Sequence, residues 1–150
     1  MNFIFRLVLG TLHRLLKLVW FLHRPRTFGA HALALTPDGK VILVRLRYAP
    51  GWRLPGGGRR EDENPRDAVL RELREEFGLI SHGEVQLAAE LEEMPDFKRD
   101  HASLFVVRDV RYQPHWSWEI EQVTEAPLNA LPPDLSPRSA AWLEALRDKL

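Results

Sequence analysis

The sequence predicts a single α/β domain with a mixed β-sheet, preceded by a separate amphipathic helix. A chain of 150 residues with 45% hydrophobic and 28% charged residues suits one globular core rather than a disordered chain. Short apolar runs typical of strands surround one clearly amphipathic segment, which indicates an α/β arrangement. The first 24 residues have a helical pattern that ends at Arg24-Pro25-Arg26. We therefore expect a helix over 1–24 and a domain over 25–150.

The segment 1–24 is predicted to be a basic amphipathic helix. Arg6, His13, Lys17 and Arg24 fall within about 40° of one another at 3.6 residues per turn, and nearly all other positions are apolar. Basic residues interrupt the run before the roughly 20 apolar residues of a transmembrane helix, and no signal-peptide cleavage site follows. Such a helix lies on an anionic membrane, docks on its own domain or pairs in a homodimer; periodicity leaves these alternatives open.

Charge and cysteine content exclude several function classes. The 21 Lys and Arg residues balance the 21 Asp and Glu residues, so no broad basic field attracts nucleic acid, and we expect no DNA or RNA partner. The absence of cysteine excludes disulfides, thiolate metal sites and cysteine nucleophiles. We expect a cytoplasmic protein, with a peripheral contact at the inner membrane surface as the open alternative.

The strand pattern begins directly after the N-terminal helix. Segments 30–35 and 41–47 are apolar runs, and Thr36-Pro37-Asp38-Gly39-Lys40 between them has the residues of a tight turn. This pattern predicts a β-hairpin, in which His31 is a strand residue with no catalytic part. Segment 48–58 is expected to be a loop that ends in three glycines.

The clearest helix follows over 65–77. Asn64 is a suitable N-cap, Pro65 suits the first helical position, and Gly78 supplies a left-handed end. Beyond it, segments 85–91, 102–110 and 116–125 have strand patterns. A short helix is predicted after Ser136, which would cap it.

This central helix presents three acidic residues beside its apolar face. Glu72, Glu75 and Glu76 share one arc, and each close pair would cost roughly 0.2–0.5 kcal/mol in an isolated helix. A divalent cation would reverse that repulsion, and oxygen ligands without Cys or His favour Mg²⁺, with Mn²⁺ as a substitute. The alternative is a solvated acidic face.

The surroundings of these acids favour phosphate chemistry. A glycine-rich segment, 56–58, precedes them and would allow backbone N–H groups to approach phosphate oxygens. Arg71 lies beside the acids and would orient one of them through a charge-assisted hydrogen bond. Metal, phosphate cradle and carboxylates together suit attack of water on a phosphoanhydride.

Segment 57–79 resembles the Nudix box, G-x5-E-x7-R-E-U-x-E-E-x-G-U, in which U is a bulky aliphatic residue. The matching positions are Gly57, Glu63, Arg71, Glu72, Leu73, Glu75, Glu76, Gly78 and Leu79. The preceding Trp52-Arg53-Leu54-Pro55-Gly56 also resembles the usual lead-in. Residues 1–24 lie outside the resemblance.

The resemblance implies an α/β/α sandwich and a Mg²⁺-dependent hydrolase. Glu72 and Glu76 would bind the metal, Glu75 would be a further ligand or the base, and the Gly57 backbone would contact metal or phosphate. Glu63 and Arg71 would hold the site together. The general base in many members is a glutamate outside the box, so Glu119 and Glu121 are candidates, although each is equally explained as a strand charge.

The resemblance also supplies candidates for substrate binding. Arg53 and Gly56 belong to the lead-in, whereas Lys98 and Arg99 form either a phosphate-binding loop or an exposed charged turn. In the family, Pro95 favours ADP-ribose, and the absence of a Pro-Gln-Gly-Gly lead-in disfavours diadenosine polyphosphates and RNA 5′ ends, which leaves nucleotide sugars and ADP-ribose as the expected substrates. The alternatives are a nucleoside triphosphate pyrophosphatase, a non-catalytic nucleotide-binding module and a membrane-recruited module.

Overall fold

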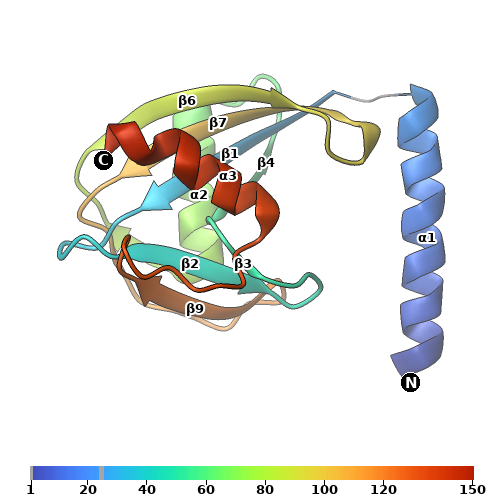
Figure 1. Ribbon diagram of the computed structural model, residues 1–150, viewed down its shortest axis with the longest axis horizontal. Coiled ribbons are helices and arrows are strands. Elements are labelled where there is room, and N and C mark those ends of the chain that lie inside the picture. Colours follow the sequence, from blue (N-terminus) through green and yellow to red (C-terminus); the bar gives the residue numbers. More distant parts are fainter. Residues whose placement is uncertain (1, 24–25) are drawn as a thin grey trace.

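Helices cover both faces of a mixed sheet in the computed structural model, which describes residues 2–23 and 26–150 (Figure 1). One sheet has the order β4 (Gly56–Arg59), β1 (Arg26–Ala34), β7 (Arg99–Val107) and β6 (Val85–Glu93). In it, β1 and β7 run parallel and the other neighbours antiparallel. A second, antiparallel sheet has the order β3 (Trp52–Arg53), β2 (Val41–Leu46) and β9 (Ile120–Ala126).

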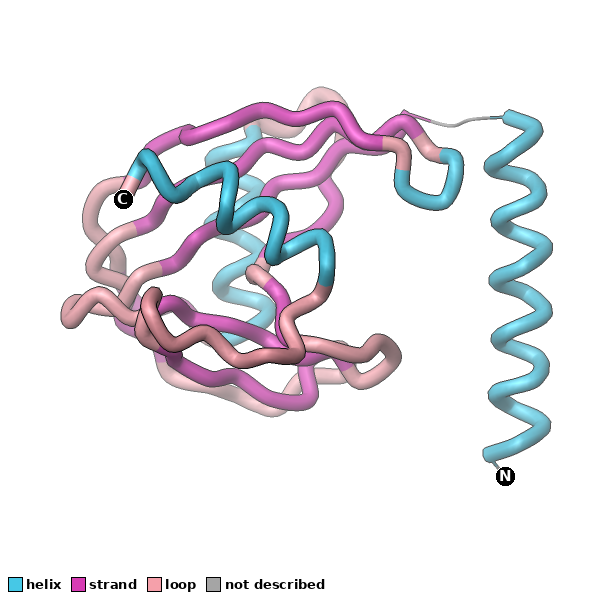
Figure 2. The backbone as a smooth tube through the Cα atoms, in the orientation of Figure 1, coloured by secondary structure: helices cyan, strands magenta, loops and turns pink. Residues whose placement is uncertain are grey.

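In the described part of the chain, three α-helices and several short elements complete the fold (Figure 2). The helices are α1 (Asn2–His23), α2 (Pro65–Phe77) and α3 (Pro137–Leu146). The short elements are the pair β5 (Leu79–Ser81) and β8 (Arg111–Tyr112) and the 3-10 turns η1 (Pro95–Phe97) and η2 (Arg147–Lys149). The predicted mixed α/β fold is confirmed.

The alternation of side chains along β1 determines which helix covers which face. Ala30, Ala32 and Ala34 are buried against α2, whereas Leu33 and Leu35 belong to the cluster that α3 covers. Small side chains on the first face leave room for the bulky apolar side of α2. The two helices therefore lie on opposite faces (Figure 1).

Both ends of α2 follow the predicted capping chemistry. The Asn64 side chain accepts from the N–H of Arg66 at 2.9 Å, and Pro65 opens the helix. Gly78 ends it with φ of +76°, a conformation that favours glycine. Ser136 caps α3 through the N–H of Ser139, also as predicted. Local sequence therefore fixes the first residue of α2, the first residue of α3 and the last residue of α2.

The predicted β-hairpin is wrong. The turn forms, but β1 and β2 diverge into different sheets and share only the bridge between Leu35 and Val41 beside it. Both edges of β1 pair with β4 and β7, and both edges of β2 pair with β3 and β9. Long-range pairing therefore replaces the local partner that alternation and turn chemistry predict.

Two further boundaries differ from the prediction. The expected loop 48–58 contains β3 and β4, and Gly57 pairs with Ala30 in an antiparallel ladder. The strand expected over 116–125 begins only at Ile120, and Trp116 and Trp118 before it are exposed. Bulky side chains there indicated a strand, but they pack against each other at the surface with ring centroids 4.4 Å apart.

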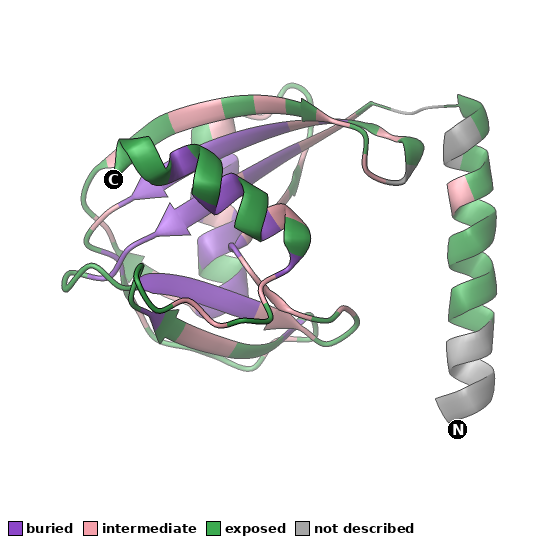
Figure 3. Ribbon diagram, viewed as in Figure 1, coloured by how far each residue is buried: buried purple, intermediate pink, exposed green. Residues whose placement is uncertain are grey.

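The N-terminal helix stands beside the domain rather than on it (Figure 1). It contacts the domain at η1, and its leucine and valine side chains are exposed from Val8 onward (Figure 3). Arg24 and Pro25 of the predicted break lie outside the described residues, as does the side chain of Arg6. Within 2–23 and 26–150, none of the helices has the length and apolar content needed to cross a bilayer.

Candidate active site

Of the three glutamates on α2, two point into the protein and one points outward. Glu76 is 4% exposed and Glu72 is 9% exposed, whereas the side chain of Glu75 is 60% exposed. The N–H of Gly56 in β4 donates to Oε2 of Glu76 at 3.0 Å. The helix therefore holds two carboxylates against the glycine-rich strand.

Burial makes the negative charge of Glu76 costly. The pKa of Glu76 is raised to about 9, mainly by burial; the Gly56 N–H opposes this rise, and the nearby charges of Glu72, Glu119 and Glu75 add to it. Burial also raises the pKa of Glu72. A cation bound between these groups would remove this penalty, and its binding would displace the proton of Glu76.

Arg71 ties the loop before α2 to the acids on the helix. Its Nε donates to Oε1 of Glu63 at 3.1 Å, and its Nη1 donates to Oε1 of Glu72 at 3.0 Å and to Oε2 of Glu75 at 3.4 Å. Its Nη2 donates to the carbonyl of Gly58 at 3.3 Å. The hydrogen bond from Arg71 lowers the pKa of Glu63. Arg71 and Glu63 thus connect β4 to α2 and position Glu72.

Close packing requires glycine at two of the three glycine positions of β4, Gly56 and Gly57. A Cβ on Gly57 would lie 2.8 Å from Cδ of Glu72, and one on Gly56 would lie 2.3 Å from the carbonyl oxygen of Ala30. At Gly58 the nearest atom, the Phe28 carbonyl oxygen, is 3.9 Å away. The N–H of Gly56 donates a hydrogen bond to Glu76. Gly56 therefore lies in a strand that supports this acid, and not in the loop that was expected.

We expect Gly57→Ala to lower activity about ten- to a hundredfold, because the new methyl group displaces the Glu72 carboxylate. Gly58→Ala is the matched control in the same strand, since its methyl group meets only ordinary contact distances. Isothermal calorimetry with Mn²⁺ and hydrolysis rates would measure both variants. Equal effects at the two positions would contradict the role of Gly57.

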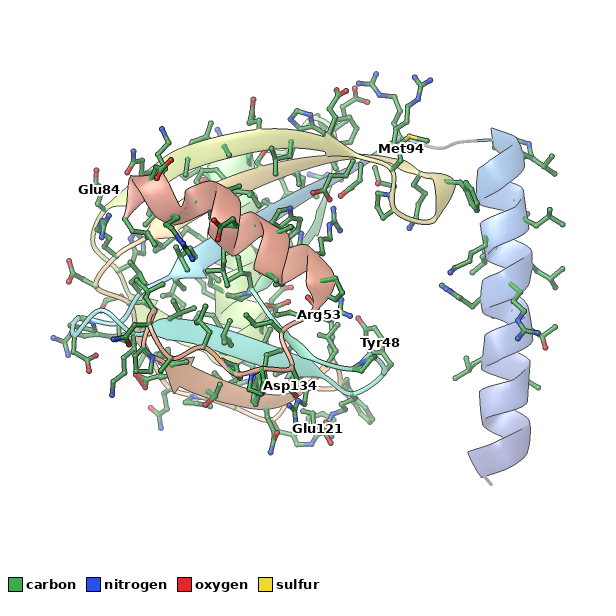
Figure 4. The ribbon with its side chains drawn as sticks, in the orientation of Figure 1. Tyr48, Arg53, Glu84, Met94, Glu121 and Asp134 are labelled. Atoms are coloured by element: carbon green, nitrogen blue, oxygen red, sulfur yellow. The ribbon has the colours of Figure 1, made fainter. Side chains whose placement is uncertain are left out.

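A cavity of about 510 Å³ opens beside these acids, between the two sheets. Glu76 reaches it from α2, Arg53 from β3 and Arg138 from α3. Gly56, Gly57 and Lys98 also line it. Arg53 and Tyr48 lie on the same side of the domain (Figure 4). The cavity thus joins the acidic helix face to basic side chains from three other places in the chain.

In each of two pairs of candidates that the sequence could not distinguish, one residue lines the cavity and the other does not. Glu119 lines it and accepts a hydrogen bond from the Tyr48 hydroxyl at 2.8 Å, whereas Glu121 is exposed outside the lining (Figure 4). Lys98 lines it, whereas Arg99 lines a different cleft with Glu92 and His101. The alternation of an extended backbone explains why the adjacent Lys98 and Arg99 point to opposite sides. Glu119, by contrast, lies in the bend just before β9, whereas Glu121 lies within that strand.

His31 is a lining residue that the sequence did not single out. The prediction of a strand position is confirmed, but the half-buried ring also borders the cavity and packs on Trp142 with centroids 4.6 Å apart. Burial, with a further contribution from Arg138, lowers its pKa to about 4, so it is neutral at physiological pH. Among the described residues, His31 Nδ1 and Arg53 Nε are buried without a hydrogen-bond partner.

Asp100 and Arg138 were also missed. The buried Asp100 accepts from the Thr27 hydroxyl at 2.7 Å and pairs with Arg138, which also donates to Glu93 at 2.7 Å. These partners lie on β1, β6, β7 and α3. No local pattern in the sequence signals a network between elements so far apart in the chain.

The donor set suits a hard divalent cation, although it is not arranged as a finished chelate. Within residues 2–23 and 26–150, no three acidic or histidine side chains already converge as metal ligands. Arg71 donates to Oε1 of Glu72 and to Oε2 of Glu75, so both carboxylates are paired with the same guanidinium. Glu72 and Glu76 nevertheless face the same strand, and a cation bound there would displace the proton that burial favours on Glu76.

Comparison with known proteins agrees with this geometry. Residues 25–146 match the family model of the NUDIX domain. An RNA pyrophosphohydrolase of Hydrogenovibrio crunogenus is 43% identical over 47 residues, which cover 31% of this chain and 28% of that relative. The match therefore spans less than a third of the relative's length.

Solved structures share the whole domain. A MutT NUDIX hydrolase from Burkholderia pseudomallei is 24% identical with a TM-score of 0.69, over 81% of this chain and 98% of that one. A bifunctional NMN adenylyltransferase/ADP ribose pyrophosphatase from Francisella tularensis, complexed with AMP and a Mn ion, is 16% identical with a TM-score of 0.71. That match covers 99% of this chain and 50% of the other. At these identities the likeness establishes the fold.

Proposed function

The chain belongs to the NUDIX family, and we propose that it is a Mg²⁺-dependent hydrolase of a nucleoside diphosphate linked to another group, such as ADP-ribose or a nucleotide sugar. The observation that carries the proposal is one cavity that joins the buried Glu76 to Lys98 and Arg138. Its volume of about 510 Å³ lies within the range of sites for ligands of drug size, about 300–1,000 Å³.

Glu72 and Glu76 would hold the cation, with the Gly57 backbone beside them and Glu75 as a further ligand after it leaves Arg71. When bound, Mg²⁺ neutralises phosphate oxygens and makes a bound water more acidic. Arg71 and Glu63 keep α2 in register with β4. Manganese is the expected substitute.

The remaining lining residues supply proton transfer and orientation. Glu119, held by the Tyr48 hydroxyl, would accept a proton from the attacking water. The oxygen of that water would bond to phosphorus as the P–O bond of the anhydride breaks. Lys98 and Arg53 would bind phosphate oxygens. His31, neutral and with an unpartnered buried nitrogen, suits an uncharged hydrogen-bonding group of the substrate.

A substrate panel with Mg²⁺ or Mn²⁺ tests the proposal. ADP-ribose and UDP-sugars yield two monophosphates, so a coupled phosphatase would release phosphate only after cleavage. Nucleoside triphosphates, assayed with inorganic pyrophosphatase, report the alternative pyrophosphatase activity. Turnover of the linked diphosphates at the highest kcat/KM would support the proposal. No turnover of any substrate with either metal would favour a non-catalytic nucleotide-binding module.

Lys98→Ala is expected to raise KM for the preferred substrate about tenfold with little change in kcat, because it removes a charged phosphate contact. Arg99→Ala is the control, since that exposed side chain lies outside the cavity. Steady-state kinetics on both variants would measure the difference. A rise in KM in the Arg99 variant and none in the Lys98 variant would reverse this assignment.

A 5′-triphosphorylated RNA end is the second candidate substrate. Two observations favour it: the identity with an RNA pyrophosphohydrolase and a cleft of about 800 Å³ that carries Arg26, Arg59 and Arg60. This cleft shares Thr27, Phe28 and Gly58 with the active-site cavity, so a chain extending from the cavity would meet it. Release of pyrophosphate from a triphosphorylated oligonucleotide, faster than from a free nucleotide, would favour this candidate over our proposal.

A further inference from the structure

The apolar face of α1 is uncovered. Leu12, Leu15, Leu16, Leu18, Val19 and Leu22 are 40–68% exposed. At 100° per residue these six positions span about 160° of the helix, roughly half of its circumference. A two-helix seam buries a narrower stripe, about two positions in every seven. The breadth of this face suits a flat apolar surface better than a second copy of the helix.

The polar side of α1 faces the domain. His13 and Lys17 lie on the side of the wheel opposite the apolar arc. Lys17 is the one half-buried residue among those of α1 whose exposure is described, and the helix contacts the domain at η1. The apolar arc therefore points away from the domain.

Charge is unevenly divided between the helix and the domain. Segment 1–24 contains no acidic residue and four basic ones, which are Arg6, Arg14, Lys17 and Arg24. Because the whole chain carries 21 basic and 21 acidic residues, the remaining segment has an excess of four negative charges. An anionic surface would thus attract the helix and repel the domain. At physiological ionic strength these forces act over a Debye length of roughly 8 Å.

We propose that α1 holds the protein on the surface of a membrane rich in anionic phospholipids. The apolar arc enters the interface between headgroups and acyl chains, the helix lies in the membrane plane, and the domain stays on its aqueous side. Lys98 follows η1 directly and lines the active-site cavity, so the helix that binds the membrane lies near one wall of that cavity.

Co-sedimentation of the full-length chain with vesicles tests this proposal. We expect binding to phosphatidylcholine vesicles that contain phosphatidylglycerol, and weaker binding to pure phosphatidylcholine or at high salt. Leu12→Gln/Leu15→Gln should weaken binding at least about tenfold, since two exposed leucines no longer enter the interface. Arg14→Gln should weaken binding to the anionic vesicles about fivefold.

Ile80→Gln/Leu87→Gln is the matched control, because it removes two exposed apolar side chains from the domain instead of α1. It should leave vesicle binding unchanged, and the α1 variant should keep full hydrolysis of a soluble substrate. Absence of binding to anionic vesicles would overturn the proposal. A second outcome would also overturn it: light scattering that finds the parent to be a dimer and the α1 variant a monomer. The apolar face would then contact a second copy of the chain.

Discussion

Glu76→Gln is expected to lower kcat/KM at least about a hundredfold while leaving the fold intact, because it would remove a proposed metal ligand and not core packing. The neutral amide keeps the size of the side chain, and its oxygen can still accept the N–H of Gly56. Hydrolysis rates and calorimetric titration with Mn²⁺ would measure the loss of activity and of metal affinity.

The pH dependence of stability separates this effect from unfolding. Burial raises the pKa of Glu76 from 4.5 to about 9. The stability that this shift contributes is therefore fully present below pH 4.5 and is lost as the pH rises through about 9. Glutamine does not ionise. In EDTA, the unfolding temperature of the variant should therefore rise relative to that of the parent as the pH increases across this range.

Metal binding should show the opposite trend with pH. A cation bound at the proposed site would replace the proton on Glu76, so the affinity of the parent for Mn²⁺ should increase as pH rises toward about 9. Glu84→Gln, at an exposed loop position far from the cavity, is the control and should change none of these measurements (Figure 4). Unchanged hydrolysis by the Glu76 variant would disprove the site.

Glu119→Gln should lower kcat about a hundredfold or more with KM nearly constant, as expected for loss of a general base. The side chain lines the cavity, and its charge is one of those that raise the pKa of Glu76. Glutamine would keep an oxygen for the Tyr48 hydroxyl but would not accept a proton from water. Steady-state kinetics with the best substrate of the panel would measure this change.

Glu121→Gln is the matched control, two residues along the same segment and exposed outside the cavity. It should change kcat by less than about twofold, as surface substitutions usually do. If Glu119→Gln kept the parental kcat while its metal affinity stayed normal, another group would have to take the proton, and Glu75 would be the next to test.

Local chemistry made α2 predictable. Asn64, Pro65 and Gly78 fix its ends through capping, fixed φ and a left-handed conformation, all of which depend on neighbouring residues only. The same helix periodicity separated Leu73 and Phe77 on the core face from the acids beside them. The helix and the mixed α/β fold could therefore be predicted from the sequence, and the resemblance of segment 57–79 to the Nudix box predicted the family.

Local chemistry also misled at β1 and β2. A good turn and two apolar runs predict a hairpin, but each strand finds its partners among segments distant in the chain, such as β7 and β9. Pairing energy comes from whichever strand edge is brought close, and a single sequence does not contain that information.

The sequence by itself determined the acids, the glycines and the arginine that the site requires, because their spacing on one helix and one adjoining strand is a local property. Only the tertiary structure decided that Glu119 and Lys98 line the cavity while Glu121 and Arg99 do not, and that His31, Asp100 and Arg138 join them. Which way a strand residue points, and which distant side chain it meets, depends on sheet register and on helix packing across the domain.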